Sequence, residues 1–344
     1  MIKIKRRRQP VIYLDIRETD PRRNLALEEH LFRTVGQTDD CFLLWQNRSS
    51  VIVGRHQNTL AETNGAFLRE HGIPAVRRLS GGGAVYHDLG NLNFTFITAR
   101  ERMEAMRFEL FCTPVVETLR ELGVDAQLSG RNDLSVDGRK FSGNSQYTSG
   151  GRLLHHGTIL FAADLETMTA ALTPPYEKLQ SKGTPSVRGR VVNLSEALGG
   201  RVSLEEFRRL LANRALRGRA CSRFSLTADD WAAVDKLARE KYGSWEWNYG
   251  DSPPCSFSVK AYWNGCGTVE ARVLLREGRI ETVKFYGDFF GEESPAALED
   301  ALCGQKPEPA ALEHVWNSIP VTRYLHGVRR EDFVRLFDGA RESA

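Results

Sequence analysis

The dipeptide Asp137-Gly138 limits the fold of this chain more than any other local pattern. It separates two short strand-like runs, 134–136 and 139–141. Asp and Gly tolerate the positive φ angles that both central residues of a two-residue β-turn adopt, so the pair is a strong hairpin signal. The sequence therefore predicts an antiparallel hairpin, with Lys140 at the start of its returning strand.

Apolar patterning predicts a chain that mixes strands and helices. Short apolar runs bounded by polar turns indicate buried strands, at 42–45, 51–53, 93–97 and 156–161. Asp20-Pro21 is a typical helix start, because Asp caps a helix well and Pro suits its first position. Apolar residues at helical spacing predict further helices, at 101–122, 203–220 and 227–242.

A turn-rich stretch, Gly250-Asp251-Ser252-Pro253-Pro254, predicts a boundary between two domains. Beyond it the sequence indicates three strands and two helices, which suffice for a small separate unit, at 256–263, 268–276, 279–286, 294–303 and 308–316. A length of 344 residues also favours two domains. We expect them at 1–249 and 250–344.

The charge and the cysteine content narrow the functional classes. The 47 basic and 44 acidic residues leave a net charge of +3, which gives little support to a nucleic-acid or membrane-surface role. The six cysteines contain no CxxC pair, and unclustered cysteines in a chain of this length are typical of a reducing compartment. No apolar run approaches the roughly 18 residues that a membrane-spanning helix needs. We therefore expect a cytoplasmic protein.

Three consecutive glycines, Gly81-Gly82-Gly83, form the most informative motif. Arg77-Arg78 precede them and His87-Asp88 follow. Without Cβ atoms the peptide N–H groups can form a concave nest for an anion, and Arg adds a charged clamp. The pattern favours phosphate or nucleotide binding, and a flexible turn between strands is the alternative. A Walker A loop is excluded because no Gly-Lys dipeptide occurs.

Two further clusters carry candidate polar groups. Asp133 and Lys140 flank the predicted turn. A Lys ammonium there could neutralise a phosphate as a compact point charge, and a surface Lys on a hairpin is the alternative. His155 and His156 are adjacent on a predicted strand, so they point to opposite faces and cannot chelate one metal. One of them can face a pocket, and a purely structural histidine is the alternative.

In order along the chain, these motifs resemble the lipoate–protein ligase family. The matching strings run from residue 15 to about residue 250 and are long enough to exclude coincidence. They include 77–91 (RRLSGGGAVYHDLGN), 130–134 (GRNDL), 139–143 (RKFSG), 155–158 (HHGT), 186–188 (SVR), 190–194 (RVVNL) and 244–248 (SWEWN). The C-terminal part, with Gly287-Asp288-Phe289-Phe290-Gly291, resembles the accessory domain of bacterial members.

The resemblance implies a two-step reaction. Lipoate, or octanoate, reacts with ATP to give an acyl-adenylate and pyrophosphate, and the acyl group then passes to a Lys of a carrier domain. The carriers would be 2-oxoacid dehydrogenase E2 components or the glycine cleavage H protein, and Mg²⁺ would assist. The resemblance also implies an α+β fold with a mixed, largely antiparallel sheet, as in biotin and lipoate protein ligases, together with a smaller C-terminal α+β accessory domain. It implies a monomer that binds neither nucleic acid nor membrane.

The roles of family residues transfer to matching positions of this chain. The resemblance implies that Lys140 lies between the α-phosphate and the acyl carbonyl and serves both steps. Asp133 would help to hold Mg²⁺, an ion that prefers oxygen ligands. A mobile loop at 181–190, with Lys182, would close over the adenylate. The residues implied to bind ATP and the lipoyl-adenylate are Arg78, Gly81, Gly82, Gly83, Ala84, Val85, Tyr86, His87, Asp133, Lys140, His156 and Thr158.

Several other functions stay open as alternatives. An octanoyl or lipoyl transferase of the same fold would use a Cys thioester, but no Cys occurs from 113 to 220. Cys41 and Cys112 lie in apolar surroundings that are typical of packing residues. A biotin ligase would carry a Gly-Arg-Gly-rich loop, which is missing. A non-catalytic lipoate-binding adaptor and an Arg-rich nucleic-acid-binding protein complete the set.

Overall fold

The computed structural model describes residues 10–99, 107–130, 132–172, 189–222, 224–249 and 257–337. Internal contacts divide the chain into two compact units. The first unit comprises Met1–Ile52, Thr63–Val76 and Val85–Ser244, and the second comprises Val53–Glu62, Arg77–Ala84 and Trp245–Ala344. The second unit therefore contains the glycine motif, although that motif belongs to the N-terminal half of the sequence. The division at 1–249 and 250–344 stays a prediction.

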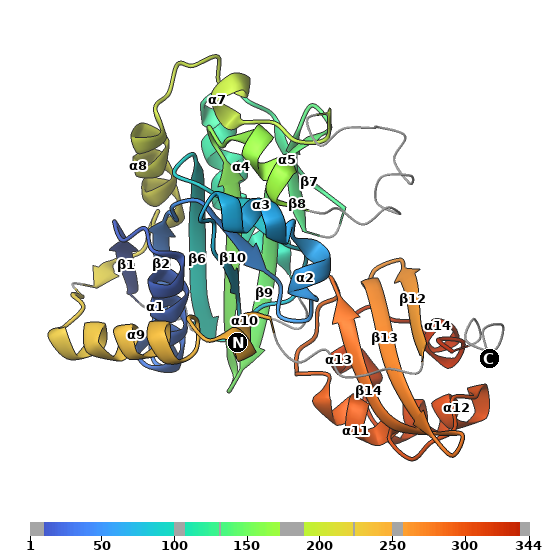
Figure 1. Cartoon of the computed structure of the whole chain (residues 1–344). Coiled ribbons are helices and arrows are strands. Elements are labelled where there is room, and N and C mark those ends of the chain that lie inside the picture. Colours follow the sequence, from blue (N-terminus) through green and yellow to red (C-terminus); the bar gives the residue numbers. More distant parts are fainter. Residues whose placement is uncertain are drawn as a thin grey trace, which may run out of the picture. The chain divides into compact units, whose positions relative to one another are not determined.

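An eight-stranded sheet forms the centre of the first unit (Figure 1). Its strands are β1 (Val11–Asp15), β2 (Asp40–Trp45), β6 (Asn91–Ala99), β7 (Ala126–Ser129), β8 (Asp133–Val136), β9 (Arg139–Ser149), β10 (Arg152–Leu160) and β11 (Cys221–Ser222). Their spatial order is β11-β1-β2-β6-β10-β9-β8-β7. Since β1 pairs in parallel with β11 and β2 while the other pairs are antiparallel, the expected mixed, largely antiparallel sheet is confirmed.

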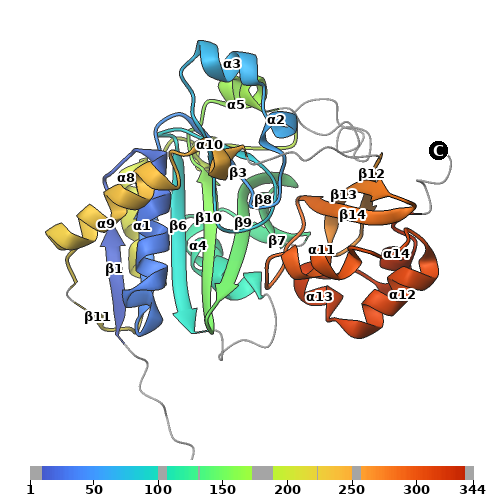
Figure 2. The same ribbon diagram turned by 60° about the horizontal axis from the view of Figure 1, so that its bottom comes forward.

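Helices pack against both faces of this sheet. On one face, α4 (Phe108–Glu121) and α8 (Leu204–Ala215) contribute to a single apolar core with β2, β6 and β10. On the other face lies α1 (Pro21–Arg33), which packs alongside α9 (Ala228–Glu240), as Figure 2 shows. Shorter helices complete the unit, namely η1 (Val35–Gln37), α3 (Gly65–Glu70), α5 (Leu165–Ala171) and α7 (Leu194–Ala197).

Alternation along β6 gives the sheet one apolar and one polar face. Leu92 and Phe94 join the core formed with α4 and α8. The intervening residues Asn91, Asn93 and Thr95 are equally buried, but they point to the face covered by α1, because successive strand residues face opposite sides. A buried polar face must satisfy its hydrogen bonds or bind a ligand.

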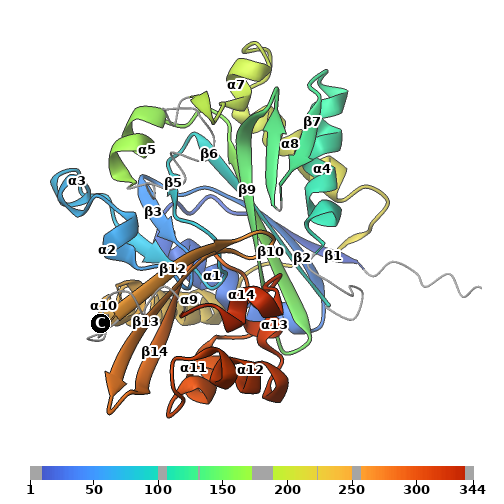
Figure 3. The same cartoon turned by 90° about the vertical axis from the view of Figure 1, so that its right-hand side faces the viewer.

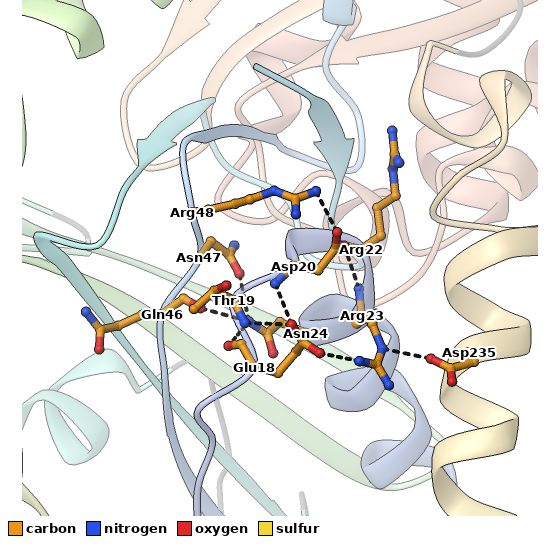
Figure 4. A network of polar contacts seen from close by, with 10 residues as sticks. All are labelled: Glu18, Thr19, Asp20, Arg22, Arg23, Asn24, Gln46, Asn47, Arg48 and Asp235. Carbon is orange, nitrogen blue, oxygen red and sulfur yellow. Dashed lines mark hydrogen bonds and ion pairs between the residues drawn. The ribbon is translucent and has the colours of Figure 1, made fainter. Parts of the chain in front are cut away.

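A polar network fixes the start of α1 above this face (Figure 4). The Asp20 side chain caps the helix by accepting from the backbone N–H groups of Arg22 and Arg23, as the Asp-Pro signal predicted. The Asn24 amide donates to the Asn47 side chain at 2.9 Å and also to the backbone carbonyls of Glu18 and Gln46. The helix start is therefore tied to the turn that follows β2.

A small sheet leads into the glycine motif. It consists of β3 (Ser50–Val53), β4 (Ala75–Arg77) and β5 (Val85–His87) in the order β4-β3-β5. The glycine motif connects β4 to β5, and β5 pairs antiparallel with β3.

Besides the glycine motif, the second unit contains a three-stranded antiparallel sheet with helices (Figure 3). Its strands are β12 (Phe257–Trp263), β13 (Gly267–Arg276) and β14 (Arg279–Gly287). Its helices are α2 (Thr59–Glu62), α10 (Trp245–Asn248), α11 (Ala296–Leu302), α12 (Pro309–Ser318), α13 (Val321–Tyr324) and α14 (Arg330–Val334). One apolar core joins the sheet to α11–α14, so the expected small α+β unit is confirmed.

The hairpin prediction is confirmed and one helix boundary is wrong. Asp137 and Gly138 adopt φ angles of 50° and 73°, as a tight two-residue turn requires. The helix expected at 203–220 ends at Ala215, because the chain turns through Gly218 at a φ of 71°. Part of the helix expected at 101–122, the proposed boundary at 250–254 and most of the loop at 181–190 lie outside the described residues. Within the described ranges, no helix is both long and apolar enough to cross a membrane.

Candidate functional site

Five strands place a row of residues side by side on the polar face of the large sheet. Asn93 on β6 lies opposite Trp45 on β2 and opposite Thr158 on β10. The backbone N–H of Gly143 on β9 donates to Thr158 Oγ1 at 3.2 Å, and Gly143 lies opposite Asp133 on β8. Because opposite residues in antiparallel strands share a face, the row brings the predicted residues Thr158 and Asp133 to one surface.

Lys140 reaches over the same row. Its Nζ forms an ion pair with Asp133 Oδ1 at 2.8 Å and lies 3.0 Å from the place that a Cβ on Gly143 would occupy. The missing side chain at Gly143 therefore leaves the space that the lysine fills. The Lys140 side chain is 40% exposed, so its ammonium remains accessible to an anion. The residue is also fixed through its backbone, which hydrogen-bonds to Arg190 and Val192.

His156 lies one pair further along the face and is oriented by a buried glutamate. Its Nδ1 is 3.0 Å from both carboxylate oxygens of Glu28 on α1. The Thr95 hydroxyl donates to Glu28 Oε1 at 2.7 Å. His155 points to the opposite face, where it stacks on Phe111, and burial lowers its pKa well below the usual value. The prediction that the two histidines face opposite sides is therefore confirmed.

His87 on β5 is held by the network that anchors α1. The Asn47 amide nitrogen lies 3.1 Å from His87 Nδ1, while Asn47 Oδ1 accepts from Asn24. Since Asn47 donates to Nδ1, the neutral imidazole carries its proton on Nε2. Figure 4 shows Asn24 and Asn47, the first two residues of this chain of hydrogen bonds, side by side.

An asparagine pair on β6 presents hydrogen-bonding atoms that have no partner in the part of the chain that the structure describes. Asn91 Nδ2 donates to Asn93 Oδ1 at 2.9 Å. Both side chains are buried, and neither Asn91 Oδ1 nor Asn93 Nδ2 finds a partner among the described residues. Unsatisfied buried groups are costly unless a ligand or a water completes them, so this part of the face is suited to binding.

The other predicted residues of β5 have ordinary structural partners. Tyr86 is buried, and its hydroxyl donates to Ser49 Oγ at 3.2 Å. Burial raises the pKa of the Tyr86 phenol, which therefore stays protonated. Val85 pairs with Ile52 of β3 through the strand register.

Arg78 and the glycines belong to the second unit. The first unit contains the other candidate residues, namely Lys140, Asp133, His156 and Thr158. The Arg78 guanidinium is buried within its own loop. It donates to Gly81 O at 2.6 Å, to Gly83 O at 2.9 Å and to Ser80 Oγ at 3.1 Å. Arg78 therefore shapes the loop from inside, with a positive charge beneath its peptide groups.

Arg77 is buried, and its hydrogen-bond partners among the described residues are all neutral. Its guanidinium donates to the backbone carbonyls of Gly54, Arg55 and Gln57, at 2.7 to 3.1 Å. It also donates to Thr59 Oγ1 and to the carbonyls of Trp247 and Asn248. Every N–H donor of the Arg77 side chain thus bonds within the protein and joins Arg77 to the segments 54–59 and 247–248. The expected use of Arg77 as an anion clamp does not fit these contacts.

The donor set suits a magnesium ion that is held mainly by substrate phosphates. No group of three or more His, Cys, Asp or Glu side chains among the described residues could hold a metal alone. Asp133 uses Oδ1 for Lys140, which leaves its second oxygen for a cation. Mg²⁺ is commonly bound by one or two carboxylates together with phosphates and waters, so Asp133 fits such a site.

Sequence reasoning missed Glu28, Asn93 and the role of Arg77. Glu28 had a usable signal, since it stands between Leu25 and Leu31 at helical spacing, where an apolar residue is expected. A glutamate on the buried side of a helix needs a partner, and His156 provides one. Asn93 and Arg77 had no comparable signal.

Comparisons with known proteins agree with this geometry. Residues 20–215 match the lipoyl protein ligase A/B catalytic domain, and residues 252–337 match the bacterial lipoate protein ligase C-terminus. Lipoate-protein ligase LplJ of Bacillus subtilis is 39% identical over 320 residues, which cover 92% of this chain and 96% of the relative.

Two solved structures are similar over the greater part of the chain. A crystal structure of lipoate-protein ligase A bound with ATP has a TM-score of 0.61 and 27% identity, covering 70% of this chain and 98% of the other. A bipartite lipoate protein ligase of Thermoplasma acidophilum, described with its E2 lipoyl domain, has a TM-score of 0.63 and 28% identity, covering 73% of this chain and 100% of the other. With both family models and a near full-length relative in agreement, the chain belongs to the lipoate–protein ligase family.

Proposed function

We propose that this chain performs the ATP-dependent ligation of its family through Lys140 and the residues around it. Lipoate is activated to lipoyl-adenylate, and the lipoyl group is then transferred to a lysine of a carrier domain. The observation that carries the proposal is the accessible Lys140 ammonium, held by Asp133 above Gly143 on the polar face of the large sheet. Positioning and charge stabilisation suffice for both steps, without a protein nucleophile.

In the first step, a lipoate carboxylate oxygen attacks the α-phosphorus of ATP. The bond between that phosphorus and the bridging oxygen to the β-phosphorus breaks, and pyrophosphate leaves. Lys140 stabilises the negative charge that develops on the α-phosphoryl oxygens. A magnesium ion held with the help of Asp133 would neutralise phosphate charge during this step. Arg78 and the segment from Gly81 to His87 bind the nucleotide, chiefly through backbone N–H groups.

In the second step, the carrier lysine amine attacks the acyl carbonyl carbon. The carbon–oxygen bond to AMP breaks, an amide forms and the amine loses a proton. Lys140 polarises the carbonyl oxygen in this step. Thr158 and His156, whose orientation Glu28 maintains, line the pocket for the acyl-adenylate.

The cysteines argue against a transferase that forms a thioester. Cys41 and Cys112 are buried, and burial raises the pKa of each thiol to about 12. A nucleophilic cysteine needs the opposite shift, toward a thiolate at neutral pH. The ligase reaction is therefore favoured over an octanoyl or lipoyl transferase of the same fold.

The carrier is a lipoyl domain of the kind found in 2-oxoacid dehydrogenase E2 components or the glycine cleavage H protein. The similar Thermoplasma acidophilum ligase, which is described with its E2 lipoyl domain, supports the E2 class. We further propose a monomer in a reducing, cytoplasmic compartment, which agrees with the free cysteines at positions 41, 112, 221, 266 and 303.

Pyrophosphate release tests the proposal directly. The full chain is incubated with ATP and Mg²⁺ and with lipoate, octanoate or biotin, in the absence of any carrier. Release with lipoate or octanoate but not with biotin is expected. Silence with all three acids, combined with acyl transfer that needs no ATP, would contradict the proposal.

A further inference from the structure

The three glycines of the loop have different surroundings within the second unit. A Cβ on Gly81 would lie 2.4 Å from the backbone oxygen of Phe289, which is far too close. A Cβ on Gly82 would lie 3.3 Å from the Phe290 ring, and Gly82 also has a φ of +86°. A Cβ on Gly83 would have no atom within 4 Å. Gly81 and Gly82 are therefore required by the protein itself, whereas Gly83 borders open space.

Phe290 is buried beside the glycine loop. Phe289 belongs to the apolar core formed by β12–β14 and α11–α14. Phe290 is only 1% exposed but is not part of that core. Its ring instead lies against Gly81 and Gly82, and its backbone carbonyl accepts from His326 N at 2.8 Å. The Phe290 ring thus forms one wall of the glycine loop.

A second contact of the loop is with the segment at 54–56. A Cβ on Gly54 would lie 1.9 Å from Gly82 O, so the backbones of these two segments are in direct contact. The His56 ring stacks on Phe289 with centroids 4.8 Å apart, and the Gly287 N–H donates to His56 O at 2.8 Å. The loop therefore contacts both Gly54 and Phe290. The two segments that contain these residues are joined by the stacking of His56 on Phe289.

We propose that Phe290 is a positioning residue for nucleotide binding. Its ring fixes the peptide groups at Gly81 and Gly82, so that the loop presents Gly83 and its following N–H groups in one geometry. A rigid loop pays less conformational entropy when it binds an anion, which is the usual advantage of preorganisation. The inference rests on the proposed role of this loop in binding ATP, and it adds a residue from the C-terminal part of the chain to that role.

The test compares Phe290→Ala and Phe290→Leu with a matched control in the full-length chain. Phe333→Leu is the control, because Phe333 is a fully buried phenylalanine of the same unit that belongs to the core. Pyrophosphate release is measured while ATP and lipoate are varied separately. Phe290→Ala should lower kcat/KM for ATP by about 10- to 100-fold and change the KM for lipoate less than about twofold. Phe290→Leu, which keeps most of the apolar volume, should recover a large part of the loss.

Three results would separate the possible failures. If the unmodified chain releases no pyrophosphate and transfers the acyl group without ATP, the proposed function is wrong and the inference falls with it. If the unmodified chain is active and Phe290→Ala matches Phe333→Leu in kcat/KM for ATP, only the inference is wrong. If Phe290→Ala does not fold, the kinetics of Phe290→Leu decide, because an equal effect on kcat/KM for ATP and for lipoate would overturn the inference.

Discussion

The hairpin that carries Lys140 and the loop that carries the glycines are built in opposite ways. The hairpin is specified locally, since Asp137 and Gly138 supply the turn and β8 pairs directly with β9. The glycine loop takes its shape from contacts with residues of distant segments, namely Gly54 and Phe290. Two motifs that are equally clear in the sequence can therefore differ greatly: the conformation of one depends on its own residues, and that of the other depends on distant contacts.

The cationic side chains of the two regions, Lys140 and Arg77, differ in exposure and in what their charge does. Lys140 is partly exposed and paired with one carboxylate, so its charge remains available to a substrate. Arg77 is buried among carbonyl oxygens, and burial, followed by the nearby charge of Arg55, lowers the pKa of its guanidinium to about 10. It is still protonated at neutral pH, but its charge serves the fold.

Replacing the exposed cation should have the largest effect on activity. Lys140→Ala is expected to lower adenylate formation by roughly 10²- to 10³-fold, because one transition-state charge stabiliser is removed. Stability should change little, since the ion pair with Asp133 is substantially exposed. Pyrophosphate release and thermal unfolding are measured together, with Lys236→Ala on the exposed side of α9 as the control. Near-normal turnover by Lys140→Ala would remove the role assigned to this lysine.

Replacing the buried cation should mainly reduce stability. Arg77→Met keeps the length of the side chain but leaves the carbonyls of Gly54, Gln57 and Asn248 without their donor. We expect the free energy of unfolding to fall by about 3 kcal/mol, since each unsatisfied buried group costs about 1–3 kcal/mol. Denaturant unfolding measures the loss, and Arg330→Met, at an exposed ion pair of the same unit, is the control. A change equal to that of the control would mean that Arg77 does not hold the loop.

A milder change tests the polar face of the large sheet. Glu28→Gln keeps the side-chain volume but replaces a carboxylate that faces His156 Nδ1 with an amide. We expect the KM for lipoate to rise about 10-fold, because the orientation of His156 is loosened, while the KM for ATP stays nearly constant. Glu240→Gln, on the exposed end of α9, serves as the control. Equal effects on both substrates would indicate a general loss of structure instead.

The smallest expected effect is a pH dependence of stability that belongs to the second unit. Burial, and then the charges of Arg55 and Arg77, lower the pKa of His56 to about 3. As the pH falls below about 6.5, the usual pKa of histidine, His56 is protonated in the unfolded chain but not in the folded one. The free energy of unfolding therefore decreases as the pH falls from about 6.5 toward 3. Between pH 7.5 and 5.5 the loss should be about 1 kcal/mol. His56→Phe preserves an aromatic ring beside Phe289 and should remove this part of the dependence, as unfolding at the two pH values would reveal; an unchanged slope would contradict it.

Much of the candidate site on the large sheet could be predicted, because its residues follow from strand alternation and a turn signal. Lys140, Asp133, Thr158 and His156 do share one polar face. Glu28 could have been found by noticing a carboxylate on the buried side of a helix. The partners of Arg77 and Phe290 could not, because no pattern near either residue encodes its contacts with distant segments, such as those of Arg77 with Asn248 and of Phe290 with Gly81.

Sequence patterns alone were enough to predict the hairpin, the capped start of α1, the opposite faces of His155 and His156, and the family. These depend on backbone preferences and short spacings, which act over a few residues. In contrast, it is the three-dimensional packing that groups the glycine loop with the C-terminal part of the chain and that requires two of its glycines beside Phe289 and Phe290. Such contacts arise from close packing of distant segments, where the available space and not the local sequence selects the residue.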